Sequence, residues 1–284
     1  MIDEGSSIDE SAKPNRVSDR RILNELVVVR GGGDLGTGTA WRLHRSGFPV
    51  IVLDIERPLA IRRTVAFSTA VTEGSITVEG VEGVLVGSPD AALDVSSRNP
   101  VAVLVGDTVP DFEDPPQVVI DARLAKEPLD TDRAMAPLVI GLGPGFTAGD
   151  HCDAVIETNR GHRLGKVIWE GSAQRNTAVP GSIGGESSKR VIRADRDGDV
   201  RWERQIADVV SAGDRLGSVQ GAAVAAPIGG VVRGLIDAGP VKVGLKIGDI
   251  DPRGDPAVCF EISDKSRSVA GGVLEAVMTW LNNS

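Results

Sequence analysis

Val27-Val-Val-Arg-Gly-Gly-Gly-Asp-Leu-Gly36 joins a run of β-branched residues to a glycine-rich turn. The apolar run is typical of a strand, and the residues after the turn are expected to open a helix. A strand, a turn and a helix in this order are the context in which a Gly-x-Gly-x-x-Gly sequence binds a dinucleotide. Gly31, Gly33 and Gly36 would then permit the tight turn, the approach of a pyrophosphate to the backbone and close helix–strand packing.

An acidic residue follows at the distance that such a site requires. Asp54 ends the next apolar run and could accept hydrogen bonds from a ribose diol, as in NAD-binding proteins. Asp34, however, places a carboxylate near the expected pyrophosphate position, and Arg57, Arg62 and Arg63 could receive a phosphate instead. Two interpretations remain open: a bound nucleotide, or a turn that only connects strand and helix.

Short apolar runs recur along the first half of the chain. Continuous runs of this kind are expected for strands that are covered on both faces, and helical segments are predicted between them at residues 36–46 and about 59–70. This alternation predicts an α/β class with a Rossmann-like parallel sheet over residues 25–187. The runs are Leu26–Arg30, Val50–Asp54, Val84–Val86, Val101–Val105, Val118–Asp121 and Leu138–Gly141.

Residues 194–219 and 225–250 form an internal repeat with an offset of 31 positions, in which glycines and branched residues recur. Two copies of a small strand–turn–strand unit predict a compact β domain over residues 188–256, similar to the barrel-sandwich hybrid of biotinyl and lipoyl carriers. The segment between the copies, Val219–Val224, contains no lysine. Neither biotin nor lipoate is therefore expected, and a docking role is favoured.

The remaining segments complete the predicted organisation. Residues 1–24 mix charged and small residues without periodicity and are expected to form a disordered tail. Residues 177–189 are rich in glycine and serine and are predicted to be a linker or a binding loop. Residues 257–284 are predicted to hold a final strand and a helix, because apolar residues recur at helical spacing over 266–281.

Composition excludes several classes of protein. The 284 residues carry 31 Lys and Arg against 40 Asp and Glu, a net charge of −9, which disfavours nucleic-acid binding. No apolar run approaches the roughly 18 residues of a membrane span, and no signal peptide is recognised. The two cysteines form neither a disulfide framework nor a zinc spacing. We therefore expect a cytoplasmic protein without a membrane segment or a structural metal.

Further candidate binding residues follow other predicted strands. Asp121, Arg123 and Lys126 lie just past an apolar run, where α/β sheets bind ligands, although a surface ion pair explains them equally well. Gly141, Gly143 and Gly145 belong to a glycine-rich loop whose N–H groups could hold an anion. His162 could join Cys152 or His151 in a metal or thiolate site only if the fold brings them together.

Motifs spread over about residues 26–276 resemble one family, the YqeB-type accessory proteins of the selenium-dependent molybdenum hydroxylase system. The resemblance implies a maturation factor for a molybdenum hydroxylase that is related to the Rossmann part of xanthine dehydrogenase accessory proteins. The expected ligand is a small phosphorylated molecule, either a nucleotide such as NAD(P) or the molybdenum cofactor. The motifs are Ile61–Phe67, Asp121–Lys126, Ile140–Gly149, Val155–His162, Gly171–Ala173, Pro180–Gly185 and Lys246–Arg253, together with the glycine turn.

The expected partners are the molybdenum hydroxylase or its cofactor-maturation proteins, and a homo-oligomer is a further possibility. Two other functions stay open at this point. An NAD(P)-dependent oxidoreductase acting on a small anionic substrate would use Asp54 and the glycine turn, with His162 as its acid–base residue. A scaffold that docks proteins and binds no small ligand is the third interpretation.

Overall fold

The computed structural model describes residues 23–125, 129–175, 185–186 and 188–283. Its largest element is a nine-stranded mixed sheet with the order β10-β9-β7-β6-β1-β2-β5-β4-β3. The seven inner strands pair in parallel, whereas β3 and β10 at the edges are antiparallel to their neighbours. The strands are β1 Val27–Arg30, β2 Val50–Asp54, β3 Ser75–Val78, β4 Val81–Val86, β5 Val101–Val105, β6 Val118–Asp121, β7 Leu138–Leu142, β9 Ala154–Ile156 and β10 Val167–Ile168.

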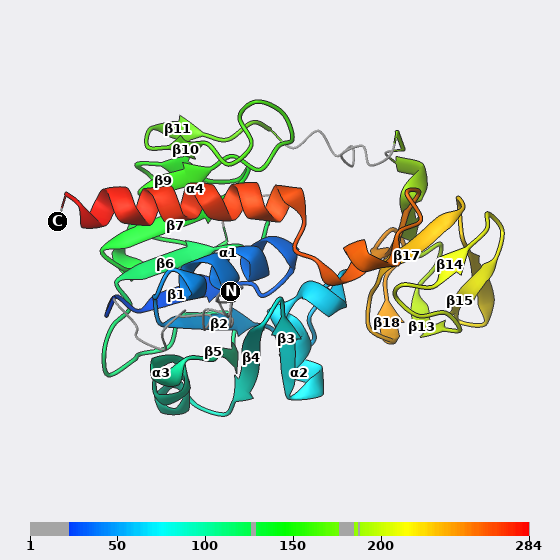
Figure 1. Cartoon of the computed structure of the whole chain (residues 1–284), viewed down its shortest axis with the longest axis horizontal. Helices are drawn as coiled ribbons and strands as arrows, with labels where there is room; N and C mark the ends of the chain where they lie inside the picture. Colours follow the sequence, from blue (N-terminus) through cyan, green and yellow to red (C-terminus); the bar gives the residue numbers. More distant parts are fainter. Residues whose placement is uncertain (1–22, 126–128, 176–184, 187, 284) are drawn as a thin grey trace, which may run out of the picture.

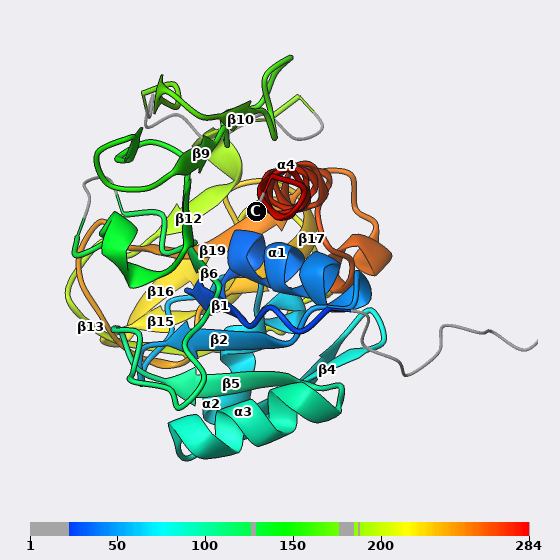
Figure 2. The same cartoon turned by 90° about the vertical axis from the view of Figure 1, so that its left-hand side faces the viewer.

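Both faces of this sheet are covered, which explains its continuous apolar strands. Val27 and Val29 point into one core and Val28 into the other, as the alternation of side chains along a strand requires. Helices α1 (Asp34–Arg45) and α4 (Asp264–Leu281) pack together over the first core, and α3 (Pro89–Arg98) covers the opposite face. Figures 1 and 2 show α4 lying beside α1 along the sheet. The short helix α2 spans Ala70–Glu73, and β8 (Thr147–Ala148) and β11 (Gly171–Ser172) form a small separate sheet.

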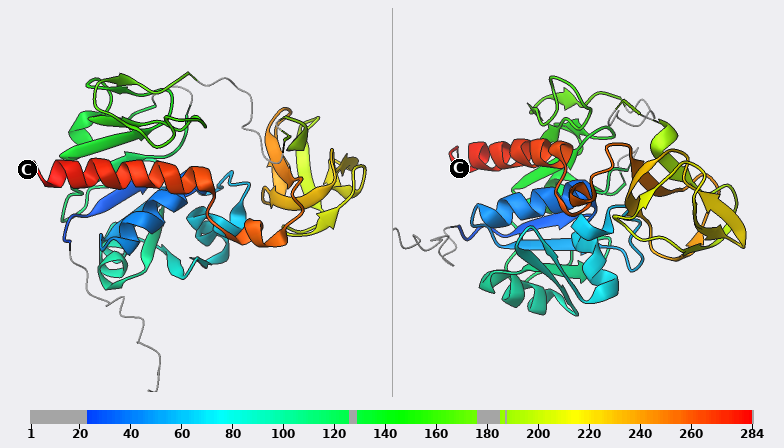
Figure 3. Two further views of the ribbon diagram at one scale, coloured as in Figure 1. Left: turned by 45° about the horizontal axis from the view of Figure 1, so that its top comes forward. Right: turned by 45° about the vertical axis from the view of Figure 1, so that its right-hand side comes forward.

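Residues 188–251 form a second lobe, here called the β lobe, at one end of the α/β lobe (Figure 3). It consists of two four-stranded antiparallel sheets with the orders β12-β19-β17-β14 and β16-β15-β13-β18. Each copy of the sequence repeat supplies the central pair of its own sheet, β13 with β15 or β17 with β19. The strands are β12 Val191–Arg193, β13 Gly198–Trp202, β14 Val209–Val210, β15 Arg215–Val219, β16 Ala222–Ala225, β17 Gly230–Leu235, β18 Gly239–Val241 and β19 Lys246–Asp251.

The predicted fold class is therefore wrong. The sheet is not a parallel Rossmann-like sheet, because the chain turns back at both edges to add an antiparallel strand. At one edge the turn consists of Glu79 and Gly80, both with positive φ, and it closes the β3–β4 hairpin. The C-terminal region is likewise a pair of separate antiparallel sheets rather than a lipoyl-like domain. Apolar runs indicated strands but not the direction in which neighbours pair.

The predicted helix over residues 59–70 is also absent. That segment contains the short 3-10 turns Arg63–Val65 and Phe67–Thr69, and it contacts the β lobe. The Arg63 Nε donates to the Leu235 carbonyl at 2.9 Å, and a Cβ on Gly234 would lie 2.6 Å from the Ile61 carbonyl oxygen. These tertiary contacts satisfy backbone and side-chain groups that a helix would direct elsewhere.

Residues 1–22 of the predicted N-terminal tail and most of the predicted linker fall outside the described residues. The predicted final helix is present as α4, which starts at Asp264. Ser263 caps this helix, because its hydroxyl accepts a hydrogen bond from the Ser266 N–H. The part of the chain that the structure describes contains no helix long and apolar enough to cross a membrane.

Candidate functional site

A cleft of about 850 Å³ opens where the glycine turn of the α/β lobe faces the β lobe. Its lining is strongly cationic in a protein whose net charge is −9. The lining carboxylates are Asp34, Asp54 and Asp249, and the lining cations are Arg62, Arg123, Arg160, Arg175, Arg190, Arg193, Arg233, Lys246 and Lys265.

Two of the three fingerprint glycines reach this cleft. Gly31, with φ of +99°, and Gly33 are among its lining residues, and a Cβ on Gly33 would meet no atom within 4 Å. Gly36 has a packing role instead, because a Cβ there would lie 1.8 Å from the Gly31 carbonyl oxygen. The turn thus offers backbone and open space to a ligand at its first half and packs tightly at its second.

Asp54 lies at the predicted place, at the end of β2 and in the cleft wall. Its Oδ2 accepts the Gly32 N–H at 2.7 Å, and its Oδ1 accepts the Ile55 N–H at 2.8 Å. Burial raises the pKa of Asp54, and these two hydrogen bonds oppose the rise. The carboxylate therefore helps to hold the glycine turn in shape while it faces the cleft.

The fold brings Asp121 and Arg123 together, and the two residues pair mainly with each other. The buried Asp121 accepts hydrogen bonds from Arg123, at 2.5 Å between Nη2 and Oδ2, and from the Thr131 hydroxyl. Asp130 bridges Arg123 at 2.7 Å and the buried Arg30 at 2.6 Å. Arg123 lines the cleft, whereas Asp121 does not. Lys126 lies outside the described residues.

The loop after β7 contributes less to the cleft than its glycines suggest. A Cβ on Gly141 would lie 2.4 Å from the Phe146 ring, and one on Gly143 would lie 2.5 Å from the Thr158 hydroxyl. Both glycines thus accommodate neighbouring side chains. Gly143 and Gly145 adopt positive φ, and between them Pro144 is the residue of this loop that lines the cleft.

The histidines and cysteines do not form a common site. His162 is exposed and is not among the residues that line the cleft. The His151 Nδ1 accepts the Thr147 N–H at 3.1 Å. Cys152 is buried, and burial raises the pKa of its thiol to about 11, so the reactive thiolate is disfavoured. Within the described ranges, no group of three or more His, Cys, Asp or Glu side chains is placed to hold a metal ion.

The β lobe supplies cleft residues that the sequence analysis missed. Arg233 lies on β17, Lys246 and Asp249 lie on β19, and Arg190 precedes β12. A signal was present in Val231-Val-Arg-Gly-Leu235, where an arginine interrupts an apolar strand. A buried charge in such a strand requires a partner, and Asp249 provides it.

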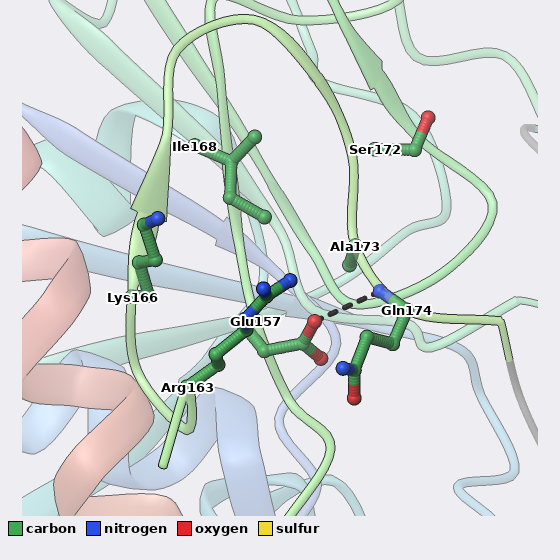
Figure 4. Close-up of a pocket in the computed structure, with 7 residues that line it drawn as sticks. All are labelled: Glu157, Arg163, Lys166, Ile168, Ser172, Ala173 and Gln174. Carbon is green, nitrogen blue, oxygen red and sulfur yellow. Dashed lines mark hydrogen bonds between the residues drawn. The ribbon is translucent and has the colours of Figure 1, made fainter.

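A smaller pocket of about 220 Å³ lies beside β10 and β11 (Figure 4). Its buried carboxylate, Glu157, accepts the N–H groups of Asn159 at 2.7 Å and Gln174 at 2.8 Å. Both oxygens of Glu157 thereby hold backbone N–H groups in place. The pocket is consequently interpreted as part of the local structure.

A known protein resembles this chain over nearly its whole length. The chain is 49% identical to "Uncharacterized protein YqeB" of Escherichia coli (strain K12) over 257 residues, which is 90% of the chain. The chain therefore belongs to the YqeB family, which the motifs indicated. The chain spans about half the length of this relative, because the match covers 48% of YqeB. No protein-family model matches the chain.

Two solved structures resemble the chain weakly. One is an aspartoacylase family protein from Mesorhizobium loti, and the other is a succinylglutamate desuccinylase/aspartoacylase from Rhodobacter sphaeroides. Each has 14% sequence identity and a TM-score of 0.27, covering 82% of this chain and 86% or 87% of the other. This degree of likeness carries no conclusion about activity.

Proposed function

We propose that the chain binds a small phosphorylated molecule, a nucleotide or the molybdenum cofactor, in the cleft between its lobes. The charge of the cleft lining supports this proposal. Nine cations and three carboxylates line the cleft, although the net charge of the chain is −9. Asp121, Asp130 and Asp264 pair with Arg123 and Arg160 at the margin, which reduces this excess without removing it. Like charges gathered beside a low-dielectric wall attract an oppositely charged ligand.

Three of these cations are available to a ligand. Among the described residues, Arg175, Arg193 and Lys265 form no ion pair with a carboxylate of the chain. Burial lowers the pKa of Lys265, and the charge of Arg160 adds to the effect. An anionic ligand would reverse that unfavourable environment, since it would stabilise the protonated amine.

The proposed pathway comes from the sequence resemblance. We propose that the protein acts as an accessory factor in the maturation of a selenium-dependent molybdenum hydroxylase, with that enzyme or its cofactor-maturation proteins as partners. The β lobe would contribute to docking as well as to the cleft. An oxidoreductase is not favoured, because the acid–base candidate His162 lies outside the cleft lining.

Calorimetric titration of matched ligand pairs tests the proposal. ADP and adenosine form one pair, and neopterin triphosphate and neopterin form the other. At least one phosphorylated member is expected to bind at least about tenfold more tightly than its dephosphorylated partner, a difference of about 1.4 kcal/mol. Lys265→Gln should weaken that binding by about tenfold, because it removes one charge-assisted contact.

Lys242→Gln is the matched control, because Lys242 is an exposed lysine of the β lobe that pairs with Asp197 away from the cleft. Its binding constants should equal those of the wild type. Equal affinities within both ligand pairs, or equal effects of the two lysine substitutions, would contradict the proposal.

A further inference from the structure

Three cations of the β lobe surround one buried carboxylate at the cleft. Arg190 forms an ion pair with Asp249 Oδ1, Arg233 Nη1 lies 3.2 Å from Asp249 Oδ2, and Lys246 Nζ lies 3.7 Å from Oδ1. All four residues line the cleft. Asp249 is 1% exposed, so the cluster is centred on a buried carboxylate of the β lobe and is not a set of surface side chains.

Two β-bulges aim this cluster at the cleft. Along β17 the register with β19 shifts between Val232 and Gly234, so Arg233 is the extra residue. Val232 and Leu235 consequently both enter the core of the β lobe although they are three positions apart, and Arg233 points to the other face. Bulges commonly redirect a side chain beside a functional site.

The second bulge lies in β19 itself. Ile192 pairs with Gly248 but Arg193 pairs with Lys246, so Ile247 is the extra residue. Without it, Lys246 and Asp249 would point to opposite faces of the sheet, because they are three positions apart. With it, both reach the same face, and Ile247 and Ile250 fill the core behind them.

The cluster has more positive charge than its own carboxylates balance. Arg233 and Lys246 both lie beside Asp249, with which Arg190 also pairs, and the neighbouring Asp251 is bound by Arg253 at 2.6 Å. Even with Arg190 left out of the count, three cations therefore face two carboxylates. Arg233 reaches Asp251 only at 3.8 Å. A network that served stability alone would be expected to balance its charges, because uncompensated buried charge is costly.

We propose that Arg190, Arg233 and Lys246 form a second anion-binding subsite, which takes a phosphate group of the ligand whose other part lies against the glycine turn. The inference rests on the proposed function in assigning both groups to one ligand that bridges the lobes. Burial lowers the pKa of both Arg62 and Lys246; the charge of Arg233 across the cleft adds to the shift of Arg62, and that of Asp34 opposes the shift of Lys246.

Protection of lysines from acetylation tests this subsite on the full wild-type chain. Inorganic phosphate is the probe, with chloride at equal ionic strength as the reference, and mass spectrometry gives the acetylation rate of each lysine. Phosphate is expected to slow acetylation of Lys246 at least fivefold and saturably, and to leave Lys242 unchanged. Equal rates for Lys246 in phosphate and chloride would overturn the subsite.

Lys246→Gln supplies an independent measurement. The variant is expected to fold, because Arg190 and Arg233 still neutralise Asp249. Phosphate should raise the melting temperature of the wild type and of Lys242→Gln more than that of Lys246→Gln, since a ligand of the native state stabilises it. Identical phosphate-induced shifts in the three proteins would also overturn the inference.

The two proposals fail in different ways. Protection of Lys246 by phosphate, with no phosphorylated compound sensitive to Lys265→Gln, would retain the subsite and refute the proposed function. Binding of a phosphorylated compound that depends on Lys265, with Lys246 unprotected, would refute the subsite alone.

Discussion

Packing requires glycine at position 36. The dinucleotide-binding motif would require glycine at the same position. A Cβ at this position would approach the Gly31 carbonyl oxygen to 1.8 Å and the Ala122 Cβ to 3.2 Å, which leaves little room for adjustment. The tight approach of α1 to the glycine turn therefore depends on the missing side chain. The same glycine pattern consequently satisfies a structural requirement before any ligand is considered.

Gly36→Ala should lower the free energy of unfolding by about 1–3 kcal/mol, the usual cost of overpacking, although alanine is the better helix former. Gly33→Ala is the matched control, because its Cβ would meet no atom within 4 Å. Urea denaturation of both variants checks the prediction. Equal stabilities would show that α1 can shift away from the turn.

Asp130 predicts a specific pH dependence of stability. Burial raises the pKa of this carboxyl, but hydrogen bonds from Arg30 and Arg123 outweigh burial and lower the pKa to about 2. A group whose pKa is lower in the folded state stabilises the protein above its unfolded pKa, here 3.8. This contribution should be lost as the pH falls from about 4 to about 2.

Asp130→Asn should therefore reduce the slope of unfolding free energy against pH between about 4 and 2, and lower stability at neutral pH. Asp150→Asn is the control, because among the described residues Asp150 takes part in no ion pair. Urea titrations at a series of pH values provide the measurement. An unchanged acid slope in Asp130→Asn would show that Arg30 and Arg123 do not act on this carboxylate.

The strands β17 and β19 show how an element can carry charge into a protein interior. Asp249 is buried and pairs with the buried Arg233, whereas Asp197 and Lys242 form a pair in which both side chains are exposed. Removing one partner from a buried pair leaves an uncompensated charge, which typically costs about 3–5 kcal/mol. Exposed pairs contribute about 0–1 kcal/mol.

Asp249→Asn is thus expected to destabilise the protein by more than Asp197→Asn, by about 2 kcal/mol or more on these typical values, because it leaves the buried Arg233 without its nearest carboxylate. Thermal unfolding of the two variants, monitored by circular dichroism, makes the comparison. Similar losses of stability would mean that water reaches Asp249 and that the cluster is less buried than its geometry implies.

Elements were predicted from the sequence more successfully than their arrangement. The apolar runs at Val50–Asp54 and Val101–Val105 are strands β2 and β5, and the helical spacing near the C-terminus is α4. Pairing direction, the β3–β4 hairpin and the two bulges depend on contacts between distant residues, which periodicity does not encode. The helix predicted over residues 59–70 was wrong because contacts between the lobes override local preference.

The sequence predicted residues on one wall of the candidate site and missed the other wall. Gly31, Gly33, Asp54 and Arg123 line the cleft. The opposite wall was missed, because the residues of the β lobe become neighbours of the glycine turn only when the two lobes pack together. The motif Lys246–Arg253 was recognised as a family feature, but nothing in its spacing indicated that it lines a cleft.

The distribution of charge over the whole molecule gives the cleft its significance. A chain with a net charge of −9 gathers nine cations around one cavity between its lobes. Figure 3 shows the β lobe seated against the end of the sheet, so both lobes contribute to the walls of this cavity. A small anion bound there would be held by groups from two separately built parts of the fold.

Native mass spectrometry of the protein purified from its own cells tests the central claim most directly. The account predicts that a phosphorylated small molecule, a nucleotide or a pterin, is released in stoichiometric amount on denaturation, and that less is released from Lys265→Gln. A protein that carries no such molecule, and takes up none when nucleotides and phosphorylated pterins are added, would contradict the account.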